Sequence, residues 1–221
     1  MVGNERSEQL AFMSLTLQRL SMKAKLTYVP GLCTSKTERF ANVNVFRRRV
    51  SVGENLLKLW SEGNFTDQDL EAILAHEIGH LMDFGSDSHS SSFRNIMLEC
   101  LWFSFGIVPL IAYLLTPTLW VLAFSVLLAL GWGFSLPWIV RRIEVGVEFE
   151  ADRKAAVSLV EPNHLANTLL KISSFVSTRG GLGLTTRLVT GAGKLTHPSF
   201  SDRVCRLKSL QPSSRRISGG W

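Results

Sequence analysis

The sequence predicts an α+β fold, mainly helical, with a small β-sheet and an inserted hairpin of two long apolar helices. Three observations predict it. Apolar residues recur at helical spacing in several segments, short β-rich segments flank an arginine triplet, and 95–140 carries one charged residue, Glu99. These features divide the chain into a first part of the domain (1–94), the hairpin (95–140) and a second part of the domain (141–221).

Composition narrows the class of protein. The chain has 221 residues, of which 46% are hydrophobic and 19% charged, and this excludes a disordered or collagen-like chain. Its three cysteines form no CxxC pair, which disfavours a disulfide framework and a zinc ribbon and favours a reducing compartment. A net charge of +6 suits nucleic acid or an anionic membrane surface. No nucleic-acid recognition motif is present, so we expect no nucleic-acid partner.

The first segments alternate between helix and strand signals. Residues 5–22 place Leu10, Met13, Leu17 and Leu20 at spacings of three and four, which predicts an amphipathic helix. Residues 25–29 read as a strand that Pro30 and Gly31 end. The segments 41–46 and 50–52 predict a β-hairpin with the arginine triplet in its turn.

A capped helix follows a short helix near residue 60. Thr66 is a good N-cap, and Asp69 stands three residues later, as in a capping box. The helix continues as DLEAILAHEIGHLMDF, with apolar residues for one buried face.

The apolar stretch predicts two membrane spans. A spanning helix needs roughly 20 apolar residues. Ile96–Leu115 and Leu119–Val140 each supply that length, and 116–118 forms the turn. Arginines at 94, 141 and 142 flank the pair, so we expect the domain on the cytoplasmic side of a lipid bilayer. The alternative is a pair of buried helices in a soluble core.

The helix after Thr66 carries the sequence HEIGH. Two histidines four residues apart, His76 and His80, lie on one face of a helix and can bind one metal ion. Glu77 lies beside them, where a carboxylate can take a proton from water. The alternative is a surface helix with two histidines that bind nothing.

A catalytic zinc normally has three protein ligands, so one more ligand is needed. The helix that is predicted after the hairpin offers Glu148, with Asp152 one turn later as an acceptor that orients a ligand histidine. Glu144 and Glu150 compete for the ligand role. Periodicity does not choose among them, because Glu144, Glu148 and Asp152 share one stripe.

HEIGH (76–80), followed by EFEAD (148–152) across an apolar hairpin, resembles the membrane metallopeptidase family of HtpX and the type 1 CAAX prenyl proteases. The resemblance extends to NVNVF (42–46), VSVGENLLKL (50–59) and THPSFSDRVCRL (196–207). It implies a zincin-like, mainly helical peptidase domain of the gluzincin type.

The resemblance also implies residue roles. One Zn²⁺ per chain is held by His76, His80 and Glu148, and Glu77 is the general base. Asp152 and Arg203 support the ligands, and His197 stabilises the oxyanion. An extended substrate pairs with the edge strand through Asn42, Val43, Asn44 and Val45.

The function implied is that of a membrane-bound zinc metalloendopeptidase in membrane-protein quality control, with unfolded or membrane polypeptides as substrates. One alternative is a processing protease for a lipidated or C-terminal substrate. The other is a membrane protein that binds zinc without catalysis. The Gly-rich segment 177–194 is expected to form a flap beside the cleft.

Overall fold

The structure is a computed structural model, and the residues it describes are 2–36, 38, 40–86, 111, 114–115, 118–178 and 198–210. In chain order its elements are α1 (Val2–Lys23), β1 (Gly31–Ser35), β2 (Ala41–Asn44), β3 (Arg49–Gly53), α2 (Glu54–Ser61), α3 (Asp67–Ser86), α5 (Leu119–Lys154), the π-helix η1 (Ala155–Leu159), α6 (Pro162–Thr178) and α8 (Phe200–Ser209). The predicted α+β class, mostly helical with a small sheet, is confirmed.

The sheet has the strand order β1-β3-β2. β1 runs parallel to β3, and β2 runs antiparallel to it with Val43 opposite Val50. The predicted hairpin of β2 and β3 is therefore confirmed. Among the described residues β2 pairs only with β3, which leaves its outer edge open.

The strand that was predicted over 25–29 is wrong. These residues close the end of α1 instead: the backbone N–H of Lys25 donates to Met22, and that of Leu26 donates to Ser21. Lys25 adopts the left-handed conformation (φ 56°) that such a helix end requires. The strand β1 therefore begins only at Gly31.

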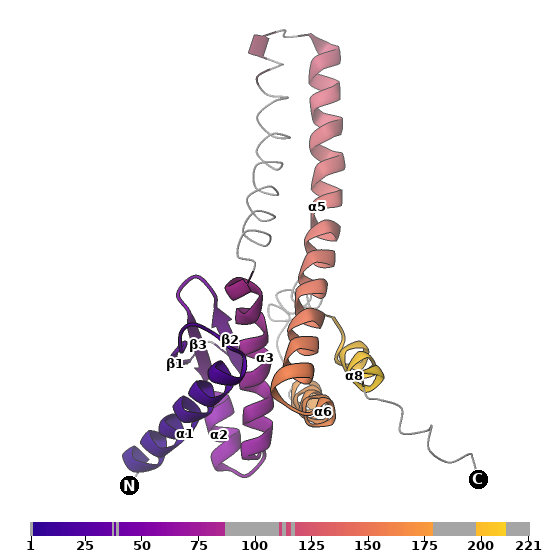
Figure 1. The fold of residues 1–221 in the computed structure, drawn as a ribbon. Coiled ribbons are helices and arrows are strands. Elements are labelled where there is room, and N and C mark those ends of the chain that lie inside the picture. Colours follow the sequence, from indigo (N-terminus) through magenta and orange to yellow (C-terminus); the bar gives the residue numbers. More distant parts are fainter. Residues whose placement is uncertain are drawn as a thin grey trace, which may run out of the picture.

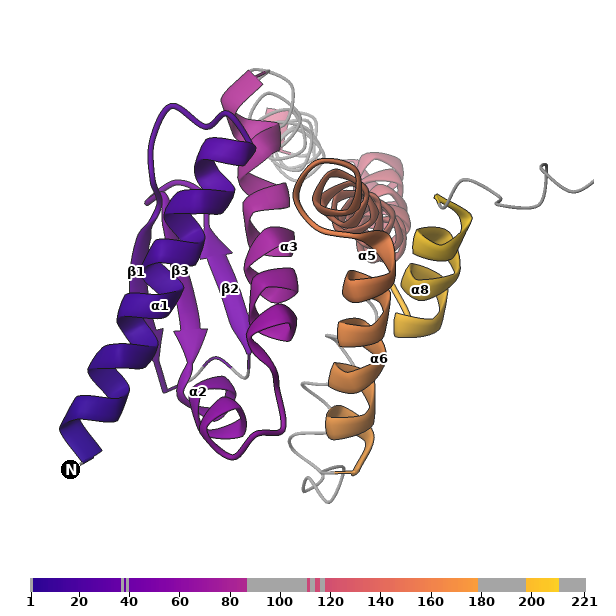
Figure 2. The same cartoon turned by 60° about the horizontal axis from the view of Figure 1, so that its bottom comes forward.

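The helices form two groups with α3 between them. Figure 2 shows α1 across one face of the sheet, α3 beside β2, and α5, α6 and α8 on the other side of α3. The core lies around α3, because this helix packs against both groups and the apolar faces of its neighbours are buried against it. Its largest members are Met13, Leu17, Leu20, Leu56, Phe65, Leu70, Leu74, Ile78, Leu81, Leu159, Leu165 and Leu207.

The helix α5 is 36 residues long and projects beyond the rest of the fold (Figure 1). Its start is capped by Thr118, whose hydroxyl accepts from the N–H of Val121 at 3.4 Å. The second predicted span, Leu119–Val140, is thus only the first part of this helix. No proline interrupts the chain between Arg141 and Lys154, and the helix continues through the charged residues there.

The two membrane spans predicted within 95–140 are not supported. Most of the first span lies outside the residues that the structure describes. Within the described part of the chain, no helix combines the length and the apolar character needed to cross a bilayer.

Candidate metal centre

The helix α3 presents its two histidines because its start and its buried face fix its orientation. The N–H of Asp69 donates to the hydroxyl of Thr66 at 3.2 Å, and the N–H of Thr66 donates to the carboxylate of Asp69 at 2.8 Å. This confirms the predicted capping box. Leu70, Leu74 and Ile78 are fully buried on one face of α3, which leaves His76 and His80 on its open face toward α5.

The helix α5 supplies the opposing carboxylates. Glu148 and Asp152 stand one turn apart, and both face α3. Glu150 lies on the outer side of α5 and pairs with Arg153 instead. The side chain of Glu144 lies outside the described residues. Of the carboxylates that periodicity left open, the structure therefore brings Glu148 to the histidines.

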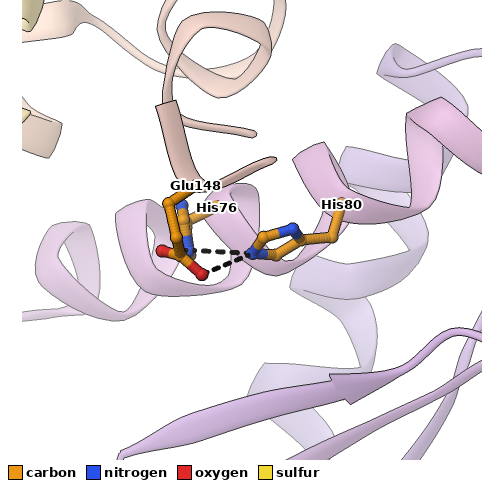
Figure 3. Close-up of side chains that lie close together, drawn as sticks. All are labelled: His76, His80 and Glu148. Atoms are coloured by element: carbon orange, nitrogen blue, oxygen red, sulfur yellow. Dashed lines mark hydrogen bonds and ion pairs between the residues drawn. The ribbon is translucent and has the colours of Figure 1, made fainter. Parts of the chain in front are cut away.

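His76, His80 and Glu148 form a compact triangle of ligand atoms (Figure 3). The two Nε2 atoms lie 3.2 Å apart, Oε2 of Glu148 lies 3.4 Å from Nε2 of His76, and Oε1 lies 3.5 Å from Nε2 of His80. Tetrahedral ligands at the zinc distance of about 2.0–2.1 Å are separated by about 3.3–3.4 Å. Each Nε2 atom therefore has the other Nε2 and one oxygen of Glu148 close to that separation, and two imidazoles with one carboxylate are donors that suit zinc.

Asp152 and Arg203 hold the triangle from behind. Nδ1 of His76 donates to Oδ1 of Asp152 at 2.9 Å, which turns Nε2 toward the triangle. Arg203 donates to both oxygens of Asp152, at 2.6 and 2.7 Å, and its Nη1 lies 3.3 Å from Glu148. Nη2 of Arg203 also lies 3.2 Å from Nδ1 of His76. Because Nδ1 already donates to Asp152, that contact is packing and not a hydrogen bond.

The buried ion pair between Asp152 and Arg203 shifts the pKa of both side chains. Burial alone would raise the pKa of Asp152, but the bonds from Arg203 and His76 outweigh burial and hold that pKa below its usual range. Burial likewise opposes the charge of Arg203, yet the bonds to Asp152 raise its pKa further. Both side chains therefore stay charged in the interior.

The pKa values of the two histidines are shifted in opposite directions. Burial and the charge of Arg203 lower the pKa of His76, but its hydrogen bonds to Asp152 and Glu148 outweigh them and raise it to about 9. Burial and the charge of His76 lower the pKa of His80 to about 4. A metal ion binds neutral imidazole and must therefore displace a proton from His76 but not from His80 at neutral pH.

Glu77 lies beside the triangle and is 7% exposed. Burial raises the pKa of its carboxyl to about 7, the charge of His76 opposes that shift, and the charges of Glu148 and Glu38 add to it. A carboxyl with that pKa can both accept and release a proton near neutral pH.

The two helices that carry the ligands cross in close contact at Gly79. A Cβ atom at this position would lie 2.5 Å from the backbone oxygen of Ala151, well inside van der Waals distance. Only glycine lets α5 approach this closely, and Ala151 lies between Glu148 and Asp152 of α5. The crossing therefore sets the distance of Glu148 from His76 and His80.

Some of the remaining predicted site residues lie within the described part of the chain, and others lie outside it. Asn42, Val43 and Asn44 lie in the edge strand β2, which packs beside α3, and Val45 follows directly. His197 lies outside the described residues, as do Glu99 and all of the Gly-rich segment 177–194 after Thr178, where α6 ends.

The comparison with known families agrees with this geometry. The sequence model of peptidase family M48 matches residues 11–211, a range that holds His76, His80, Glu148, Asp152 and Arg203. The chain belongs to peptidase family M48. Membership indicates a metallopeptidase, a hydrolase that acts on polypeptides. The comparisons with curated proteins and with solved structures gave no match.

Proposed function

We propose that this M48 member is a zinc metalloendopeptidase, with one Zn²⁺ held by His76, His80 and Glu148. The observation that carries the proposal is the cluster of ligand atoms, in which the two Nε2 atoms lie 3.2 Å apart and each lies 3.4–3.5 Å from one of the two oxygens of Glu148. The buried carboxylate of Glu77 is adjacent to His76 in the chain. A zinc ion held there would supply Lewis acidity, which would lower the pKa of a water toward about 7 and polarise the scissile carbonyl.

Glu77 is the general base in this proposal. It takes a proton from the attacking water and delivers that proton to the leaving amine. Both transfers need a carboxyl whose pKa is close to the working pH, and the pKa of about 7 supports this role. A solvent-exposed glutamate, with a pKa near 4.3, would hold the proton too weakly to deliver it efficiently.

Asp152 and Arg203 are positioning residues. Asp152 fixes the ring of His76, and Arg203 fixes Asp152 while contacting Glu148, so one guanidinium ties two ligands together. We also propose His197 as the group that stabilises the oxyanion, on the resemblance of THPSFSDRVCRL to the family pattern.

The substrate is proposed to lie extended along β2. This strand has an open edge beside α3, and an added peptide strand satisfies the free backbone groups of such an edge. Asn42, Val43, Asn44 and Val45 then supply the main-chain partners.

The proposal also names the substrates and the place of the reaction. We propose that the protein cleaves unfolded or misassembled membrane proteins at a lipid bilayer. The support is the first part of α5, which projects beyond the peptidase fold (Figure 1). Large apolar side chains are exposed along it. They are Leu119, Trp120, Leu122, Phe124, Val126, Leu127 and Leu130. An apolar surface of this kind marks a contact with lipid or with an apolar partner.

The test compares the wild type with Glu77→Gln on an unfolded protein substrate, in detergent and in liposomes with added zinc. We expect cleavage by the wild type and its loss in Glu77→Gln, with one zinc still bound per chain in both. Cleavage that persists in Glu77→Gln would exclude Glu77 as the base. Zinc binding without cleavage by either protein would favour the non-catalytic alternative.

A further inference from the structure

The turn that joins β2 to β3, residues 45–48, carries both an aromatic ring and positive charge on its surface. Phe46 is 85% exposed, and Arg47 and Arg48 beside it are exposed too. Arg49 follows at the start of β3 and is also exposed. The turn therefore presents an apolar group and three guanidinium groups together.

Hydrogen bonds hold the turn in one conformation. The N–H of Arg47 donates to the side-chain oxygen of Asn44 at 2.9 Å, and the N–H of Arg48 donates to the carbonyl of Val45 at 3.2 Å. The carbonyl of Arg48 accepts from the N–H of Gly31 at 2.9 Å. Arg48 adopts the left-handed conformation (φ 51°), which glycine adopts without strain. The chain thus keeps a cationic side chain at a position whose backbone favours glycine.

The connection between α1 and β1, residues 24–30, lies against this turn. The guanidinium of Arg48 stacks on the ring of Tyr28, with its Cζ atom 4.4 Å from the ring centre. The next residue, Val29, is 52% exposed and adds a second apolar side chain. We call the surface formed by these exposed residues the basic tip, and its members are Val29, Phe46, Arg47, Arg48 and Arg49.

No carboxylate among the described residues neutralises the basic tip. The segments 24–31 and 44–49 contain no aspartate or glutamate. The ion pairs formed by the described side chains include none of the three arginines of the tip. The positive charge is therefore available to a partner, and a partner that is anionic outside and apolar inside complements both features of the tip.

The basic tip lies at the end of the fold from which α5 projects. β3 leads directly into α2, which lies near the bottom of Figure 1. The turn before β3 therefore lies at the opposite end, where α3 ends and the first part of α5 projects. That part has no charged residue from Leu119 to Val140, and Arg141 and Arg142 follow it. A lipid surface that covers the apolar part of α5 is thus on the same side as the tip.

We propose that the basic tip binds the surface of an anionic lipid bilayer, with its arginines among the headgroups and Phe46 inserted between them. Guanidinium groups bind phosphate oxygens well, and an aromatic ring is stabilised at the boundary between headgroups and acyl chains. A soluble polyanion would attract the arginines but would leave Phe46 and Val29 uncovered, so the observations favour lipid. The inference deepens the bilayer setting of the proposed function and rests on it, but no step of it uses peptide hydrolysis.

This contact would also orient the proposed substrate strand. β2 ends at Asn44, directly before the turn, and packs beside α3. One end of the open edge of β2 would therefore lie at the lipid surface. A polypeptide segment that leaves the bilayer there can pair with β2 without first crossing open solvent.

The experiment places a bimane label at the tip and measures its contact with lipid. Phe46→Cys is made in the full chain, with Cys33, Cys100 and Cys205 replaced by serine so that one thiol is labelled. The control label is at Glu62→Cys, which follows α2 at the opposite end of the fold. Each protein is added to vesicles of phosphatidylcholine, with or without phosphatidylserine, that carry a nitroxide quencher on the headgroup.

We expect strong quenching at the tip in the anionic vesicles, weaker quenching in the neutral ones and none at the control position. Arg47→Gln with Arg48→Gln should remove most of the quenching, since each cation near an anionic surface contributes about fivefold to binding. Arg47→Lys with Arg48→Lys keeps the charge and should keep the quenching. Lys58→Gln with Lys208→Gln removes the same charge from exposed positions elsewhere and should also keep it.

Equal quenching in the two kinds of vesicle would overturn the inference, as would quenching that survives the loss of both arginines or that occurs at the control position instead. A label that responds to duplex DNA or polyglutamate but not to anionic vesicles would mean that the partner is a soluble polyanion. Zinc content and thermal unfolding show that each variant is folded.

These outcomes are separate from the failure of the proposed peptidase. A wild type that cleaves its substrate while the tip stays unquenched would refute the lipid contact alone. A tip that is quenched in anionic vesicles, on a wild type that cleaves nothing, would support the lipid contact and refute the peptidase.

Discussion

The candidate metal centre has two halves, one positioned by contacts within a single helix and the other by packing between helices. On α3, His76 and His80 meet because they are four residues apart in one helix, and the cap at Thr66 fixes where that helix starts. On α5, Glu148 and Asp152 reach them only through a long-range packing contact and an ion pair to a third helix. The first half is local and the second is tertiary.

This difference indicates which substitutions should disturb the site most. The local half keeps its geometry as long as its helix forms. The tertiary half depends on Gly79, which permits the approach, and on Arg203, which ties the carboxylates in place. Changes at the crossing should therefore cost more than changes at the cap.

The largest effect is expected for Gly79→Ala. The new Cβ would lie 2.5 Å from the oxygen of Ala151, so α5 must retreat by about 1 Å to reach normal contact. Zinc ligands tolerate about 0.2 Å, so zinc affinity should fall at least about 100-fold, as measured by competition with a chelating dye. Gly146→Ala is the matched control on α5, because nothing lies within 4 Å of that Cβ. Equal zinc affinity in the two variants would show that the crossing does not set the ligand distance.

The next effect is expected for Arg203→Met. The change leaves the carboxylate of Asp152 buried without its cation, which costs about 3–5 kcal/mol of unfolding free energy. Denaturant unfolding measures it, and zinc affinity should fall about 10–100-fold in parallel. Arg206→Met, on the same helix but exposed and stacked on Phe149, is the control. Similar losses for both arginines would contradict the special role of Arg203.

The contribution of the contact between the two halves can also be measured from the pH dependence of the unfolding free energy in metal-free protein. The folded-state pKa of His76 lies above its unfolded value, at about 9, so its contribution to stability is complete below about 6.5 and is lost as the pH rises through 9. Glu77, with a pKa raised to about 7, loses its contribution between about 4.5 and 7. Stability should therefore fall from pH 6 to pH 9, by about 3 kcal/mol from His76 alone.

Denaturant unfolding at the two pH values checks this slope. Asp152→Asn removes the carboxylate that α5 offers to His76 and should flatten it, because His76 then loses the bond that raises its pKa. A slope of the opposite sign would mean that the histidine does not carry the proton.

The smallest effect is expected for Thr66→Ala. The change removes the hydroxyl that accepts from the N–H of Asp69, and such a cap contributes about 1 kcal/mol. Thermal unfolding should show this loss, while kcat/KM of the folded protein stays near that of the wild type. Thr66→Ser should restore most of the stability. A large fall in kcat/KM would show that the local half is not independent.

The same division explains what the sequence could predict. The cap, the helix and the positions of His76 and His80 depend on neighbours in the chain, and all were predicted. The choice of Glu148 over Glu150 depends on which face of α5 meets Gly79, and the sequence alone leaves that open. The wrong strand over 25–29 has a similar cause, since the β-rich pattern does not reveal that Lys25 and Leu26 close α1.

The long sequence separation within the metal centre also orders events during synthesis. Arg203 lies 127 residues after His76 and 51 after Asp152. Because a chain leaves the ribosome N-terminus first, both histidines emerge long before the guanidinium that secures the carboxylates. A nascent chain that has not yet reached Arg203 carries every proposed zinc ligand but not the group that holds them together. The arrangement of residues that is proposed to bind zinc would therefore be completed only late in synthesis.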